Sequence, residues 1–174
     1  RFKCDWSSDV CSSDLDMARD AEMPTRDYLQ LVKTGDLNEL PVAVTQQVLL
    51  QARSAIEQYG DPTKRNAYRD DLFEILQTAL AKAPAGGDHQ LALVRNSIAV
   101  ARTSKHVGIV HSWFEGSDVL EGLVVDTDLR WSFVARLVAL GVLPERAIDE
   151  ELERDNTAGG QRQAAAARAG IPSA

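Results

Sequence analysis

The chain has 174 residues, of which 44% are hydrophobic and 26% charged, a balance typical of a soluble globular domain. Its 19 Lys and Arg against 26 Asp and Glu give a net charge of -7, which argues against the basic surface that nucleic-acid binding requires. No apolar run approaches the roughly 18 to 20 residues that cross a bilayer, and no secretory leader opens the chain. We therefore expect a cytoplasmic protein with no nucleic-acid or membrane partner.

The first fifteen residues differ from the rest of the chain. They hold both cysteines, Cys4 and Cys11, with a near-repeat of Ser-Ser-Asp and no helical or strand period. A metal clip or a small disulfide loop is the alternative, but no histidine or further cysteine nearby completes a ligand set. The segment resembles a translated sequencing-adapter read. We therefore predict a non-native, disordered leader at residues 1–15 and a domain at residues 16–174.

Helical periodicity runs through the rest of the chain, since apolar residues recur at three and four and capping chemistry stands at the breaks. In the first half the expected helices run from Pro24 to Gly35, from Pro41 to Gly60 with Tyr59 on the buried stripe, and from Pro62, capped by Asp61, to Pro84. In the second half the expected openings are Asp88, Ser104, Asp126 or Thr127, Pro144, and Thr157 before residues 158–169.

This pattern gives about eight helices, whose starts are about 15 to 25 residues apart. Short connections between helices of this length favour antiparallel neighbours. The sequence therefore predicts an all-α fold of stacked antiparallel helix pairs, a HEAT- or armadillo-like α-solenoid with a right-handed superhelix.

Catalytic and metal-binding constellations are missing from this pattern. There is no His-Glu-x-x-His zinc signature, and His106 and His111 are rotated by about 140° from each other on one expected helix. His89 follows a helix cap, where we expect it to be solvated. There is also no Gly-rich phosphate loop and no Gly-x-Ser-x-Gly elbow. We expect no catalytic residue, metal ligand or cofactor in this chain.

Two acids and an arginine crowd one expected helix start in the sequence VVDTDLRW. In a structural interpretation Asp126 and Asp128 cap the helix while Arg130 holds a neighbouring loop, and capping alone accounts for the acids. In a functional one the three residues contact substrate or another domain, because a guanidinium forms two parallel bonds to a carboxylate. A nearby acidic run is expected to be a solvated helix face and contains Glu150, Glu151, Glu153 and Asp155.

Four stretches carry a resemblance to a known family. They are DMARDAEMPTRDYLQLV from Asp16, GDHQLALVR from Gly87, VLEGLVVDTDLRW from Val119 and ELERDNTAGGQRQAAAARAGIP from Glu151. Together they resemble the helical C-terminal domain of the aminopeptidase N family of zinc metallopeptidases, also called endoplasmic-reticulum-aminopeptidase-like. The alanine-rich helices and the excess of Arg over Lys look like a high-GC bacterial member.

The resemblance implies a non-catalytic domain that closes over the active site of a zinc aminopeptidase and shapes the chamber that admits peptides. Its partners would be the parent's catalytic domain and peptide substrates, with Zn held in that other domain. No motif of this sequence matches a catalytic or zinc-binding residue, so we expect a fragment, cut at both ends, with no activity of its own. The alternative is a freestanding helical-repeat scaffold that binds a protein partner, which the upstream reading frame would distinguish.

Overall fold

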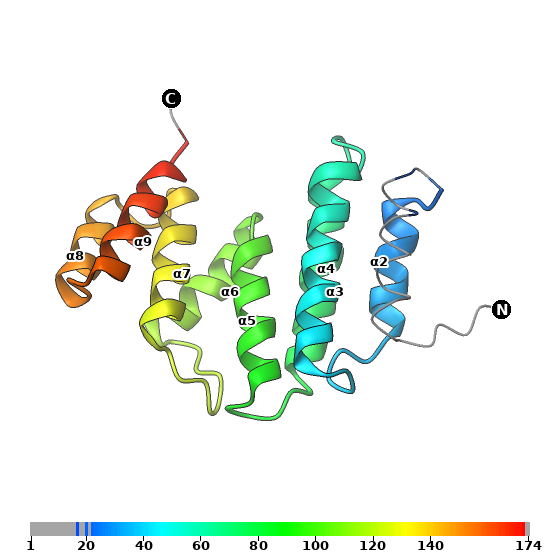
Figure 1. The fold of residues 1–174 in the computed structure, drawn as a ribbon, viewed down its shortest axis with the longest axis horizontal. Coiled ribbons are helices and arrows are strands. Elements are labelled where there is room, and N and C mark those ends of the chain that lie inside the picture. The colour runs from blue at the N-terminus through cyan, green and yellow to red at the C-terminus, as the bar shows by residue number, and fades with distance from the viewer. Residues whose placement is uncertain (1–16, 18–19, 21, 173–174) are drawn as a thin grey trace. The chain divides into compact units, whose positions relative to one another are not determined.

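The computed structural model describes Met17, Asp20 and residues 22–172, and every regular element within them is a helix (Figure 1). Eight α-helices and one short π-helix follow in chain order, and the described part contains no β-strand, as the sequence predicts. None of these helices combines the length and apolarity needed to span a membrane. The leader expected at residues 1–15 lies outside the described residues, so its disorder stays a prediction. The chain divides into two compact units, residues 1–100 and residues 101–174.

The first unit consists of helix pairs that pack on each other. Its described elements are α2 (Thr25–Thr34), α3 (Val42–Ser54), the π-helix η1 (Ala55–Tyr59), α4 (Arg65–Leu80) and α5 (Asp88–Val100). Helix α2 packs against both α3 and α4, and α5 packs against the same two helices. The hairpins α2–α3 and α4–α5 therefore lie against each other within this unit, which is the local arrangement expected of helix pairs.

Apolar stripes at helical spacing make the core of the first unit. Among its largest fully buried side chains are Leu37, Leu49, Ile56, Leu72, Phe73, Leu76 and Leu93. Two pairs of polar groups inside it are joined by neutral hydrogen bonds. The hydroxyl of Tyr28 donates to Oε1 of Gln51 over 3.2 Å, and that of Thr45 donates to the carbonyl of Leu37 over 2.8 Å. Both bonds join segments that are separated along the chain.

The end of α3 differs from the continuous helix that the sequence predicts. Ala55–Tyr59 forms η1, and Tyr59 is 39% exposed rather than buried. A π-helical turn takes more residues than an α-helical one, so a stripe with the α-helical period leaves the core after Ile56. Gly60 follows because a Cβ there would lie 2.7 Å from the carbonyl oxygen of Ile56.

Three helix starts also lie away from their predicted positions, and one of them is the helix predicted to open at Pro144, which begins at Arg146. Oδ1 of Asp61 accepts hydrogen bonds from the backbone nitrogen and the hydroxyl of Thr63, at 2.9 and 2.7 Å. These bonds close a turn, and α4 begins only at Arg65. Further along, the cap before the second unit's first helix is Thr103 rather than Ser104, and its side chain accepts from the backbone nitrogen of His106.

The second unit is organised around one central helix. It contains α6 (Ser104–Glu115), α7 (Thr127–Ala139), α8 (Arg146–Arg154) and α9 (Ala158–Ala169). Helix α7 packs against the other three, and α8 also packs against α9. Its core cluster is Trp131, Val134, Val138, Ile148, Ala164 and Ala167. Helix α9 contributes only small residues to it, which allows its backbone to lie close to α7. The start and end of α9, including its Thr157 cap, are those predicted.

Candidate functional site

The three candidate residues of the sequence stand at the start of α7. Asp126 is the N-cap, and its Oδ1 accepts from the backbone nitrogen of Leu129 at 2.7 Å. The choice between Asp126 and Thr127 is thereby settled for Asp126. Asp128 lies exposed in the first turn, where a negative charge meets the positive end of the helix dipole. Both acids therefore have the positions that helix capping explains.

Arg130 binds a buried carboxylate on α8. Its Nε lies 3.0 Å from both carboxylate oxygens of Glu151, and its Nη2 lies 2.9 Å from Oε2. The guanidinium also stands 5.3 Å from the ring centroid of Phe114 on α6. The Glu151 side chain is only 4% exposed, against 29% for Arg130. Because a buried carboxylate needs a partner, this pair ties α7 to α8.

The solvated acidic face predicted for α8 is wrong for Glu151 and Asp155. Oδ2 of Asp155 accepts from Nε1 of the buried Trp131 at 2.9 Å, and Oδ1 accepts from the hydroxyl of Thr157 at 2.7 Å. The Thr157 bond first, and then the Trp131 bond, hold the pKa of Asp155 below its ordinary value. Two other members of the run, Glu150 and Glu153, are exposed as predicted.

These contacts leave Arg130 with few free hydrogen-bond donors for a ligand. Most of its fork is engaged with Glu151, so a peptide carboxylate could use only the exposed edge or would have to displace Glu151. Asp128, by contrast, lines an open hollow between the starts of α7 and α9, together with Asp155, Thr157 and Arg162. Contact of Asp126, Asp128 and Arg130 with substrate or another domain stays a prediction.

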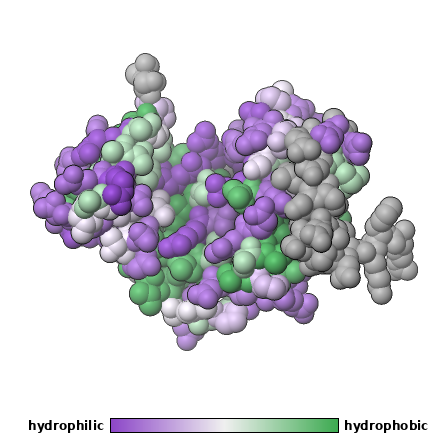
Figure 2. Space-filling view, viewed as in Figure 1, coloured by the Kyte–Doolittle hydropathy of each residue, from purple (hydrophilic) through white to green (hydrophobic). Residues whose placement is uncertain are grey.

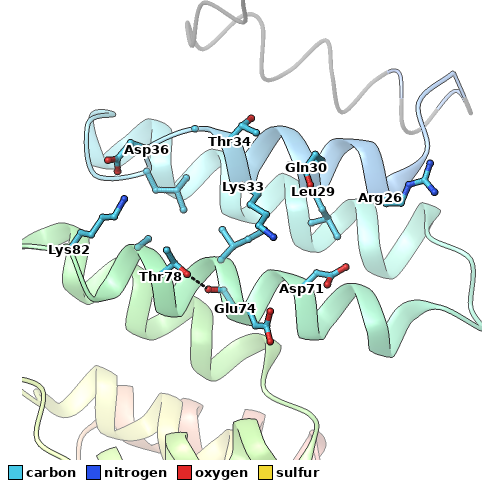
Figure 3. A pocket seen from close by; sticks show the side chains of 14 residues that line it. Arg26, Leu29, Gln30, Lys33, Thr34, Asp36, Asp71, Glu74, Thr78 and Lys82 are labelled. Atoms are coloured by element: carbon cyan, nitrogen blue, oxygen red, sulfur yellow. Dashed lines mark hydrogen bonds between the residues drawn. The ribbon is translucent and has the colours of Figure 1, made fainter.

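A groove between α2 and α4 is a concave feature of the first unit that sequence reasoning missed (Figure 3). Its volume is about 540 Å³. Figure 3 shows Lys82 extending toward Asp36 at one end, while Lys33 reaches from α2 toward α4. The charged side chains of its lining are Arg26, Lys33 and Lys82 against Asp36, Asp71 and Glu74. Because these charges balance, the groove has no net field to select an anion or a cation.

Histidines and acids form no metal centre in the described residues, where no group of three or more possible ligands is close enough to share an ion. His106 is buried, and Nε2 of His111 lies 3.4 Å from Oε1 of Glu115. The expectation of a solvated His89 is wrong, since its Nε2 lies 2.8 Å from the carbonyl oxygen of Leu40. His89 therefore ties the first turn of α5 to the segment before α3.

Comparison with known proteins gives the class to which this all-helical chain belongs. The ERAP1-like C-terminal domain matches residues 10–174, and the chain belongs to that family. A similar protein is aminopeptidase N of Streptomyces lividans, which is 46% identical over 157 residues. These residues make up 90% of this chain but 18% of that protein, so the chain spans less than a fifth of its relative. The resemblance inferred from the sequence is confirmed, while the boundary at residue 16 stays a prediction.

Proposed function

We propose that the chain is the non-catalytic C-terminal helical domain of a cytoplasmic zinc aminopeptidase that removes N-terminal residues from peptides. Zn and the catalytic residues belong to a domain outside this sequence. The helical domain closes over the active site and shapes the chamber that admits peptides. Peptide substrates and the catalytic domain are its partners.

The observation that carries this proposal is the extent of the match. The family covers residues 10–174, and the Streptomyces lividans relative, named as an aminopeptidase N, aligns with 90% of the chain. At 46% identity over this length, the same helices and helix contacts are expected in both proteins. A wall built from such helices has no need of a metal site of its own.

The proposal extends to the arrangement of the helices. The two packed hairpins of the first unit support a HEAT- or armadillo-like solenoid with a right-handed superhelix, because each hairpin presents a face on which a further pair can stack. Such stacking produces a concave surface of the kind that walls a chamber.

A hybrid enzyme tests the function directly. The matched region of the Streptomyces lividans aminopeptidase N is replaced by the corresponding residues of this chain, and hydrolysis of aminoacyl-arylamides and of peptides is measured. We expect kcat/KM within about tenfold of the unaltered enzyme, a change of about 1.4 kcal/mol in transition-state stabilisation. The 174-residue chain alone serves as the control and is expected to be inactive. A folded hybrid that hydrolyses neither substrate would refute the proposed function and favour the alternative of a helical scaffold that binds a protein partner.

The same hybrid tests the proposed contact of Arg130. If Arg130 meets substrate together with Asp126 and Asp128, Arg130→Ala raises KM for longer peptides and spares small arylamides, because only the longer substrates reach this wall. Equal effects on both substrate lengths, with a lower unfolding midpoint, would make Arg130 a purely structural partner of Glu151.

A further inference from the structure

The loop between α6 and α7, residues 116–126, carries exposed apolar side chains in a sequence otherwise rich in acids. Val119 and Val124 are each 76% exposed, and Val125 is 38% exposed. Hydrophilic residues cover most of the face seen in Figure 2, and hydrophobic residues reach it in separate patches. Single exposed apolar residues are common on proteins, but three within one loop give it more apolar surface than such scattered residues do, and burial would remove that surface from water.

The backbone of this loop is held in a defined conformation. The backbone nitrogens of Ser117 and Asp118 donate to the carbonyl of Ser112, and the side chain of Asp118 accepts from Nε1 of Trp113 at 3.2 Å. These bonds anchor the beginning of the loop to the last turns of α6. The loop is therefore attached at its start to a helix of the second unit's packed body.

A tight turn lies between the two most exposed valines. The backbone nitrogen of Leu123 donates to the carbonyl of Leu120 at 3.1 Å, and Gly122 has a φ of 76°, which suits the third position of a turn that requires glycine. Val119 and Val124 stand directly before and after this turn. Leu120 and Leu123 are half-buried, whereas the two valines point their surface to solvent.

The charges around the valines indicate what can cover them. Residues 116–128 contain four acids and no Lys or Arg, namely Asp118, Glu121, Asp126 and Asp128. A second copy would bring the same acids against each other, in a chain whose net charge is already -7. The complementary occupant is an apolar surface bordered by Lys or Arg side chains.

We infer that the α6–α7 loop is a contact site for the catalytic part of the parent aminopeptidase. The surface that it contacts there is apolar and bordered by Lys or Arg side chains. This inference rests on the proposed function and adds to it the place of contact. The valines enter an apolar depression there, and the acids of the loop face its basic border. Asp126 and Asp128, which the sequence singled out, would then face this basic border rather than a peptide.

Photo-cross-linking in the hybrid enzyme tests the inference. A benzoyl-phenylalanine is introduced in place of Val124, and the control carries it in place of Leu50, which is 50% exposed on α3 in the other unit. We expect cross-links from position 124 to enzyme residues outside the exchanged region, in several-fold higher yield than from position 50. The double variant V119S/V124S should weaken protection of the loop's contact surface from hydrogen exchange, with D128N doing so only at low salt.

Each other outcome overturns the inference. Cross-links from position 124 to a second copy, or a dimer of the 174-residue chain that V119S/V124S converts to monomer, would assign the loop to self-association. An active hybrid without cross-links from position 124 would leave the proposed function intact and refute the inferred contact of the α6–α7 loop. A folded but inactive hybrid would refute the proposed function itself, and the inferred contact with it.

Discussion

The two compact units hold their helices together by different means. In the first unit, α2 to α5 bury long apolar stripes, and buried polar side chains such as Tyr28 and Gln51 are joined by neutral bonds. In the second unit, α8 has nine residues and buries only Ile148 and Glu151, while α9 buries only glycine and alanine. Short helices remove little apolar surface from water, so the ion pair of Glu151 with Arg130 adds a directed bond between α8 and α7, whereas α9 is held on α7 by close packing of its alanines.

Charged side chains help to hold the helices together in the second unit. Around α7, Arg130 pairs with Glu151, Trp131 with Asp155, and the guanidinium of Arg136 donates to the carbonyl of Ala101. Each bond joins α7 to a segment at least 21 residues away in sequence. The charges of the first unit lie mainly at its surface, where an ion pair contributes little.

The largest effect is expected from Trp131→Ala. The ring is 1% exposed, and its removal leaves a cavity and deprives Asp155 of its donor. We expect a loss of roughly 3–5 kcal/mol in unfolding free energy, measured by urea unfolding followed by circular dichroism. Trp131→Phe separates the hydrogen bond from most of the buried area. Phe73→Ala, at 1% exposure in the first unit, is the matched control for area alone. A loss below about 1 kcal/mol for Trp131→Ala would mean that α7 is not the centre of its unit.

Arg130→Ala should destabilise the chain by roughly 2–3 kcal/mol, below the 3–5 kcal/mol of a fully buried pair because Arg130 is 29% exposed. The substitution leaves the carboxylate of Glu151 buried, with Nη1 of Arg154 at 3.8 Å as a weak substitute. The double variant Arg130→Met with Glu151→Leu should regain most of the loss, since no charge is then buried.

The first unit supplies the control for that pair. Nε of Arg69 lies 2.7 Å from Oε1 of Glu57, and here the arginine side chain is the more buried partner, at 14% exposure against 48% for the glutamate. Removal of Arg69 therefore leaves a solvated carboxylate, not a buried one. Arg69→Ala should cost no more than about 1 kcal/mol. Equal losses for Arg69→Ala and Arg130→Ala would show that burial of the carboxylate left behind does not decide the cost.

Two glycines sharpen the account of close packing in the second unit. A Cβ at Gly160 on α9 would lie 1.9 Å from the carbonyl oxygen of Asp155, whereas one at Gly108 on α6 would meet nothing within 4 Å. Gly160→Ala should therefore lose about 1–3 kcal/mol through forced displacement. Gly108→Ala should gain about 0.5–1 kcal/mol through helix propensity. Thermal unfolding of both variants measures the contrast, and effects of the same sign would contradict it.

The smallest expected effect is on the loss of stability at low pH. The pKa values of Asp61 in the first unit and Asp155 in the second lie below their ordinary range, through hydrogen bonds from Thr63 and Thr157 respectively. A lowered folded pKa stabilises the protein above the unfolded value of about 3.9, and this contribution is lost as the pH falls through the folded pKa. Asp61→Asn and Asp155→Asn should therefore each lose less stability than the wild type between pH 5 and pH 2, by urea unfolding. Steeper acid dependence in either variant would reverse the sign.

The sequence predicts those parts of the fold that local chemistry decides. Gly35 ends α2, Thr157 caps α9, and Asp126 caps α7, because each acts on backbone groups within four residues. Asp61 shows the limit of the same reasoning, since its side chain is satisfied by a turn before α4 begins. The hydrophobic period also could not reveal η1, because it continues unchanged through the last residues of α3.

The candidate site was predictable only in part. The capping role of Asp126 follows from its position, but the partner of Arg130 stands 21 residues later in an acidic run that composition assigns to solvent. One signal was present, since Glu151 follows Ile148 by three residues and so shares the apolar face of α8. The groove between α2 and α4 depends on how two helices pack, which no local pattern encodes.

The π-helical turn at the end of α3 bears on how this chain tolerates changes in length. A residue inserted into an α-helix rotates everything after it by about 100° and would turn buried side chains outward. In η1 the wider π-helical turn accommodates one extra residue. Val48 and Leu49 before this turn and Ile56 within it therefore all remain in the core. A chain one residue shorter in this segment could close the same span as regular α-helix. We therefore expect the end of α3 to tolerate the loss of one residue inside a helix rather than in a loop.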